Sequence, residues 1–131
     1  MRRIQSITIN LRYIVDDVDS AIVFYRDQLG FDVDMHPAPG FAALSRDGVK
    51  LYLNRPGVGS AGQADDTGAA PEPGGWNRFQ IECDDFEFIV ERLRSSGVKF
   101  RTTMAQGQGG WQALVEDPSC NLIELFEPKR P

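Results

Sequence analysis

The feature that most constrains this chain is an internal repeat. Asp17 and Asp85 lie 68 positions apart, and each stands between a stretch of alternating apolar residues and a stretch with helical spacing. Gly30 and Gly97, which end the two helical stretches, lie 67 positions apart. Further along, the offset drifts only to 70 and 72 for the pairs Phe41–Trp111 and Leu53–Leu125. Offsets that change so little, with insertions at turns, indicate two copies of one structural unit.

The first copy has the pattern of a strand, a helix and three more strands. Residues 4–15 alternate between apolar and polar side chains, which is typical of a half-buried strand. Apolar residues then recur at helical spacing from Val18 to Leu29, between the N-cap candidate Asp17 and the helix-ending Gly30. The remaining strands are expected over residues 31–36, 40–46 and 49–54, with a turn at Asp47-Gly48.

The second copy follows a segment of different composition. Residues 56–75 are rich in Gly and Pro and have no hydrophobic period, so we expect a flexible loop that is either disordered or a functional lid. A strand through Phe79, Ile81 and Cys83 and a helix that stops at Gly97 come next. The last three strands are expected over residues 98–103, 111–116 and 121–126. The prediction is a single domain over residues 1–131, with module one at 4–55, the loop at 56–75 and module two at 76–128.

Two tandem βαβββ modules predict an α+β fold. A chain of 131 residues is long enough to bury a core without disulfides or metals. One module alone would leave a curled sheet with an open edge. Two modules, from one chain or from a dimer, would form a curled, half-barrel mixed sheet around a cavity on its concave side.

Composition excludes several classes of function. A formal net charge of −5 argues against nucleic acid, whose phosphates need a basic surface. No stretch has the apolar length of a membrane span, and the N-terminus has no signal-peptide core. Cys83 and Cys120 are too far apart for a metal knuckle and too few for a disulfide framework, so a cytoplasmic protein is expected. His36 is the one histidine, which limits any metal site.

Near the end of the chain, a carboxylate interrupts an apolar strand. Asp117-Pro118-Ser119 favours a tight turn, because Pro presets φ and the Asp and Ser side chains bond nearby backbone. Ile123 and Leu125 then share one face of the strand, and Glu124 lies on the other. A charged side chain at this position faces either water or a cavity that uses its charge.

Three features together resemble the vicinal oxygen chelate superfamily, the family of glyoxalases, bleomycin resistance proteins and dioxygenases. They are the repeat, this closing motif and the segment Phe24-Tyr25-Arg26-Asp27-Gln28-Leu29-Gly30-Phe31. The resemblance covers nearly the whole chain and implies the glyoxalase/bleomycin-resistance fold, with a ligand cavity. In metal-using members, the ligands come from the first and last strand of each module. The resemblance places these positions at Asn10, Tyr52, Arg78 and Glu124.

The residues at these positions argue against a metal. Divalent iron, nickel or zinc needs three or four imidazole or carboxylate donors. Asn is a weak ligand, neutral Tyr is a poor one, and Arg cannot lose its proton. Arg78 is better matched to Glu124 as an ion pair. We therefore expect no cofactor and no metal ligands, and a divalent metal remains the minority alternative.

The same faces of the predicted strands carry the candidate ligand-binding residues. Alternation alone favours solvated outer faces of a half-exposed sheet. The resemblance instead implies that this face lines the ligand pocket. Trp76 and Trp111 are either packing residues or stacking surfaces for a planar ligand. The expected ligand-binding set is Asn10, Arg12, Phe41, Tyr52, Trp76, Arg78, Gln80, Trp111 and Glu124.

Two functional classes follow from the resemblance. The first is a metal-free binding protein of the bleomycin-resistance kind, a homodimer that sequesters a small aromatic or antibiotic-like molecule and so confers antibiotic resistance. The second is a lyase, isomerase or dioxygenase of the same superfamily, acting on a small carbonyl or aromatic substrate, with Glu124 as the catalytic base if any residue is. That role needs a raised pKa at Glu124, which a neighbouring Arg78 would oppose. A partner-binding regulator with an empty cavity is a third possibility.

Overall fold

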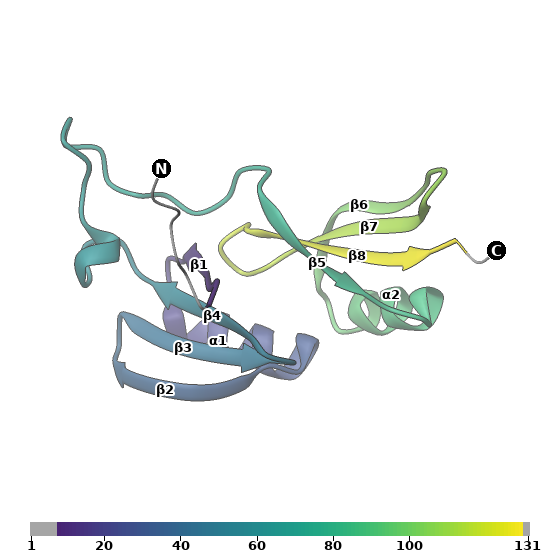
Figure 1. The fold of residues 1–131 in the computed structure, drawn as a ribbon, viewed down its shortest axis with the longest axis horizontal. Coiled ribbons are helices and arrows are strands. Elements are labelled where there is room, and N and C mark those ends of the chain that lie inside the picture. The colour runs from purple at the N-terminus through teal and green to yellow at the C-terminus, as the bar shows by residue number, and fades with distance from the viewer. Residues whose placement is uncertain (1–7, 130–131) are drawn as a thin grey trace, which may run out of the picture. The chain divides into compact units, whose positions relative to one another are not determined.

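The computed structural model describes residues 8–129, which form two compact units divided between Glu72 and Pro73. Each unit is a βαβββ module with a four-stranded mixed sheet, so the predicted α+β class and tandem repeat are confirmed (Figure 1). No helix in the described part of the chain is long and apolar enough to cross a membrane.

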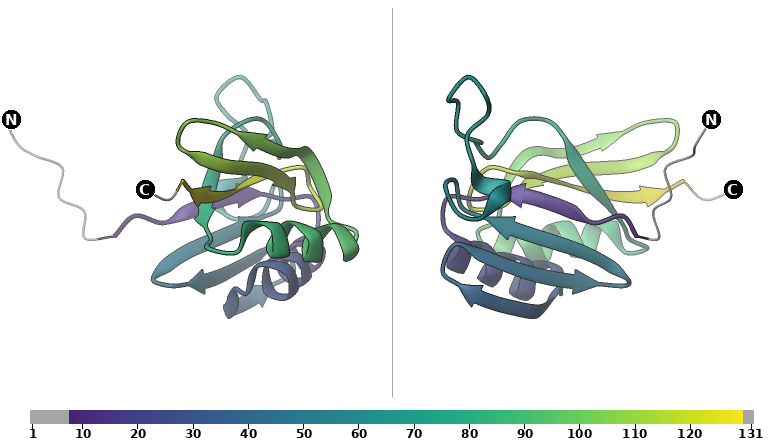
Figure 2. Two further views of the ribbon diagram at one scale, coloured as in Figure 1. Left: turned by 90° about the vertical axis from the view of Figure 1, so that its right-hand side faces the viewer. Right: turned by 60° about the vertical axis from the view of Figure 1, so that its left-hand side comes forward.

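The first unit consists of one helix and four strands. In its sheet, the strand order is β1-β4-β3-β2, with β1 parallel to β4 and the other pairs antiparallel. Figure 2 shows the helix α1 against one face of this sheet. The elements are β1 (Leu11–Ile14), α1 (Val18–Leu29), β2 (Asp32–Ala38), β3 (Phe41–Arg46) and β4 (Val49–Asn54).

The ends of α1 follow the sequence prediction. The Asp17 side chain accepts a hydrogen bond from the Asp19 N–H at 3.1 Å and so satisfies one of the free amide donors of the first turn. Gly30 ends the helix with φ 74°, a left-handed conformation that favours glycine. Of the strand predicted over residues 4–15, residues 4–7 lie outside the described residues, and within the described part strand pairing begins at Leu11.

The second unit repeats this arrangement with strand order β5-β8-β7-β6, in which β5 and β8 are parallel. Its helix is capped differently, because Glu127 of the last strand, and not Asp85, accepts from the Phe86 N–H at 2.9 Å. The elements are β5 (Arg78–Glu82), α2 (Phe86–Ser95), β6 (Lys99–Gln106), β7 (Gly110–Glu116) and β8 (Leu122–Pro128).

Each unit has its own apolar core between helix and sheet. In the first unit, Tyr25 of α1 and Leu53 of β4 are fully buried, and Leu93 of α2 and Leu125 of β8 are their counterparts in the second. Burying one such side chain contributes about 1.5–3 kcal/mol. The opposite face of each sheet is therefore the one left for polar residues.

Strand pairing corrects one offset read from the sequence. Phe41 pairs with Asn54, and the equivalent pair in the second unit is Gln112 with Phe126. The structural counterpart of Phe41 is thus Gln112, while Trp111 lies one position earlier. Because side chains alternate along a strand, this one-residue slip puts Trp111 on the helix-packed face of its sheet.

The segment between β4 and β5 contains ordered local structure. A short 3₁₀ helix, η1 (Ser60–Gly62), lies in it. The Gly57 N–H donates to the Gly62 carbonyl at 2.6 Å and closes a compact turn. The Asp65 carboxylate forms a second turn by accepting from the Thr67 and Ala69 backbone.

Candidate functional site

The polar face of the second unit is built around Glu124. One of its carboxylate oxygens accepts from Arg78 Nε at 2.9 Å, and the other accepts from Gln80 Nε2 at 2.6 Å. Gln80 lies directly opposite Glu124 in the parallel β5–β8 pair, so the strand register brings the two side chains together. The ion pair predicted between Arg78 and Glu124 is therefore confirmed.

The environment of Glu124 fixes its charge. Burial would raise its pKa, since the side chain is only 13% exposed. Hydrogen bonds from Gln80, Arg78 and Gln112, together with the Arg78 charge, outweigh burial, and the pKa lies below its usual value. Glu124 is thus an ionised acceptor with its lone pairs largely occupied, which is unfavourable for a general base.

The corresponding face of the first unit carries an aromatic and cationic group centred on Tyr52. The Phe41 and Tyr52 rings stack with centroids 6.0 Å apart and an interplanar angle of 29°. The Arg12 guanidinium carbon lies 5.0 Å from the Tyr52 ring centroid, a cation–π distance. Asn10 Nδ2 donates to Tyr52 Oη at 3.4 Å. These four predicted site residues are brought together, and we call them the Tyr52 platform.

Asn54 belongs to the same face, and the sequence prediction did not include it. It lies two residues after Tyr52 on β4 and pairs with Phe41, so its side chain shares their face. The residue is 3% exposed. Strand alternation beyond Tyr52 was the signal that could have identified it.

Trp76 and His36 make their contacts with residues outside these two groups. Trp76 is 66% exposed, and the Arg101 guanidinium carbon lies 4.7 Å from the centroid of its ring. Arg101 also donates to the Gly75 carbonyl at 2.6 Å, which fixes the guanidinium beneath the ring. His36 lies on β2 with its Nε2 3.5 Å from an Asp19 carboxylate oxygen.

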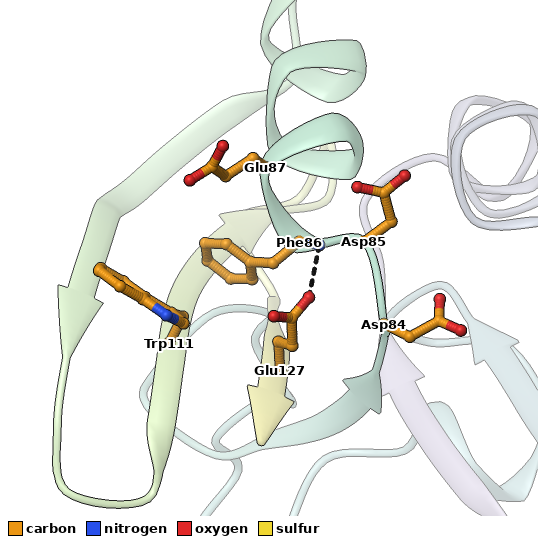
Figure 3. Close-up of a pocket in the computed structure, with 6 residues that line it drawn as sticks. All are labelled: Asp84, Asp85, Phe86, Glu87, Trp111 and Glu127. Atoms are coloured by element: carbon orange, nitrogen blue, oxygen red, sulfur yellow. Dashed lines mark hydrogen bonds between the residues drawn. The ribbon is translucent and has the colours of Figure 1, made fainter. Parts of the chain in front are cut away.

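Trp111 lines a separate pocket on the helix side of the second unit (Figure 3). Its indole faces Phe86 across the pocket, which has a volume of about 200 Å³. The Glu87 and Glu127 carboxylates lie beside these rings, and Glu127 accepts from the Phe86 N–H. Aromatic faces beside carboxylates favour cationic groups over anionic ones. The lining residues are Asp84, Asp85, Phe86, Glu87, Trp111 and Glu127.

The donor set does not fit a divalent metal. No group of three His, Cys, Asp or Glu side chains within residues 8–129 is placed to hold an ion. Arg78, at one of the family's ligand positions, brings a permanent positive charge to within 2.9 Å of Glu124. A cation at Glu124 would have to displace this guanidinium and the Gln80 amide.

Comparisons with known proteins agree with this architecture. A family model described as "Glyoxalase/Bleomycin resistance protein/Dioxygenase superfamily" matches residues 3–125. A bleomycin resistance protein from Geobacillus stearothermophilus is 29% identical over 121 residues, which cover 86% of this chain and 90% of that protein.

Two solved structures show the same fold. The lactoylglutathione lyase of Agrobacterium tumefaciens matches with a TM-score of 0.72 and 21% identity, over 95% of this chain and 96% of that one. The bleomycin-binding protein of bleomycin-producing Streptomyces verticillus, complexed with copper(II)-bleomycin, matches with a TM-score of 0.63 and 18% identity, over 97% of this chain and all of that one.

Proposed function

Because this chain belongs to the glyoxalase/bleomycin resistance protein/dioxygenase superfamily, we propose that it binds a small aromatic, antibiotic-like molecule without a metal and without transforming it. The observation that carries this proposal is the state of Glu124. It is ionised, bonded to Arg78 and Gln80, and so occupied by protein donors. A catalytic role for Glu124 would need its carboxylate to be free of hydrogen bonds from protein side chains.

The polar faces offer binding groups instead. In the first unit, the Tyr52 platform offers stacked aromatic rings and the Arg12 guanidinium. The second unit, taken by itself, offers the Arg78–Glu124–Gln80 group. An aromatic surface with a few fixed polar groups is typical of small-molecule sites. This role is consistent with the similar proteins, which include a bleomycin resistance protein and a bleomycin-binding protein.

Calorimetric titration tests the proposal. Metal-free bleomycin, copper(II)-bleomycin and a panel of other aromatic antibiotics would be titrated into the chain, with product analysis after incubation. We expect saturable binding of at least one compound, which is recovered unchanged. Tyr52→Leu should weaken that binding about tenfold, since stacking of this kind is worth roughly 0.5–1.5 kcal/mol beyond buried area.

A matched control lies on the helix side of the second unit. Glu91→Gln alters an exposed carboxylate on α2, outside the polar face and the Trp111 pocket of that unit, and should leave affinity unchanged. The proposal is wrong if no compound of the panel binds. It is also wrong if the purified chain holds stoichiometric metal through Glu124, which would favour the lyase, isomerase or dioxygenase alternative.

A homodimer is part of the proposal. The outer strands carry exposed apolar side chains: Met35 on β2 is 49% exposed and Met104 on β6 is 46% exposed. Outer strands of this kind tend to pair with another chain. Light scattering coupled to size-exclusion chromatography would test it, and a monomer at all concentrations would count against it.

A further inference from the structure

Asn54 has a buried oxygen that no group in residues 8–129 satisfies. Asn54 Oδ1 is inaccessible to solvent and accepts no hydrogen bond within this described range. The Asn54 Nδ2 group makes only a long contact, 3.4 Å, to the Val58 carbonyl. Exchanging the oxygen and nitrogen of the amide does not solve the problem, because a carbonyl would then face a carbonyl. Either orientation leaves a buried polar group without its partner.

Such an arrangement is unfavourable for folding and is uncommon. Most buried polar atoms in proteins have a hydrogen-bond partner, and leaving one without a partner costs free energy. A leucine of similar size would avoid that cost. Departures from local rules of this kind are expected at functional sites.

The position of Asn54 connects it to the Tyr52 platform. Tyr52 and Asn54 are two residues apart on β4, a separation of about 7 Å along the strand on the same face. Phe41 lies opposite Asn54 in the β3–β4 pair and stacks on Tyr52. Asn54 is therefore the direct cross-strand neighbour of a platform residue, and a molecule on the platform would lie close to the Asn54 side chain.

Residues 55–63 cover Asn54. We call this segment the strap. The Arg55 N–H donates to the Gly40 carbonyl at 2.9 Å and fixes the start of the strap. The Val58 side chain lies so close to Gly40 that any side chain at position 40 would collide with it. Only the long Nδ2–Val58 contact joins the strap to the Asn54 side chain in this range of the chain. Because Asn54 Oδ1 is inaccessible to solvent, a ligand can reach it only when the groups that cover it move.

We propose that Asn54 Oδ1 accepts a hydrogen bond from an N–H group of the bound molecule, and that the site selects aromatic compounds carrying an amide or amine N–H beside the ring. This inference rests on the proposed binding function and adds the recognition chemistry. The aromatic ring stacks on the Tyr52 platform, and the N–H reaches the Asn54 oxygen, which accepts no hydrogen bond from residues 8–129.

A pair of matched probes tests the inference on the wild-type chain. 2-Naphthamide has amide N–H groups, and N,N-dimethyl-2-naphthamide has the same ring without them. By ligand-observed NMR titration, we expect 2-naphthamide to bind about fivefold to tenfold more tightly, the range of one neutral hydrogen bond. Equal affinities for the two probes would overturn the inference.

The Asn54→Leu variant separates a ligand role from a structural one. It should lose the preference for 2-naphthamide while its melting temperature stays equal or rises, because a buried unsatisfied group has been removed. Retained preference in a folded Asn54→Leu chain would also overturn the inference. Asn77→Leu, at an exposed asparagine of the second unit, should leave the preference intact.

The outcomes distinguish this inference from the function on which it rests. If the wild-type chain binds an antibiotic of the panel but binds the two naphthamides equally well, only the proposed role of Asn54 is refuted. If neither naphthamide nor any antibiotic binds, both proposals are wrong. If Asn54→Leu does not fold, the comparison of the two probes on the wild-type chain still decides.

Discussion

Replacing Asp117 with alanine should strongly destabilise the second unit. Its Oδ1 accepts from the Ser119 N–H at 2.8 Å and the Asn121 N–H at 2.9 Å, and its Oδ2 accepts from Asn121 Nδ2 at 3.1 Å. All three residues are buried: Asp117 and Asn121 are 3% exposed, and Ser119 is 6% exposed. The turn between β7 and β8 is thus organised by one carboxylate.

The magnitude follows from the donors left behind. Each buried donor without a partner costs about 1–3 kcal/mol. For three neighbouring donors, relaxation of the turn and entry of water would offset part of the summed cost. We therefore expect Asp117→Ala to lower the free energy of unfolding by about 3–4 kcal/mol. Urea denaturation followed by circular dichroism, with the transition assigned to the second unit by hydrogen exchange, would measure it.

Asp65 provides a matched control with the same substitution. Its carboxylate also accepts three hydrogen bonds, from Thr67 N at 2.8 Å, Thr67 Oγ1 at 2.6 Å and Ala69 N at 3.0 Å, but in an exposed turn. Water can replace the lost acceptor there, so Asp65→Ala should lower the unfolding free energy much less than Asp117→Ala does. Equal losses for the two variants, or a loss below about 1 kcal/mol for Asp117→Ala, would refute the reasoning from burial.

Three further predictions concern Glu124 and Cys120. Because the pKa of Glu124 in the folded chain lies below its ordinary value of 4.5, its ionised form stabilises the fold above that pH, and the contribution is lost as pH falls through the lowered pKa. Glu124→Gln should therefore show a shallower loss of stability in acid denaturation below about pH 4.5, and an unchanged slope would contradict the assignment. Cys120 has φ 67°, so Cys120→Gly should raise the free energy of unfolding by about 0.5–1 kcal/mol in urea titration, whereas a decrease would show that the thiol's contacts outweigh backbone strain. A hydrogen bond to Glu116 raises the pKa of the Cys120 thiol, so a disulfide reagent should modify this exposed cysteine more slowly at pH 8 than it modifies a model thiol, and Glu116→Gln should speed the reaction.

Local signals in the sequence predicted much of the fold. The Asp17 cap, the Gly30 stop and the turn at Asp47-Gly48 each depend on a few neighbouring residues, and all three are present, the last with positive φ at both residues. The Arg78–Glu124 pair was also predictable, because alternation puts both side chains on the same face of their two strands.

Other features depend on pairing that the sequence does not specify. The counterpart of Phe41 was assigned to Trp111, whereas pairing assigns it to Gln112, because the turns on either side of β7 set its register. The burial of Asn54 results from the strap, whose position over β4 no periodic pattern predicts. Trp111 was placed in the expected ligand-binding set for its residue type, and the structure puts it in the pocket beside α2.

The last strand of each repeat occupies an inner place in its sheet, and this has a consequence for biosynthesis. β4 separates β1 from β3, and β8 separates β5 from β7. Leu11 pairs with Leu51, so the first strand has no neighbour until nearly the whole repeat has left the ribosome. Each nascent module must therefore wait, with an apolar sheet surface exposed to chaperones, until its final strand is inserted between two strands made earlier.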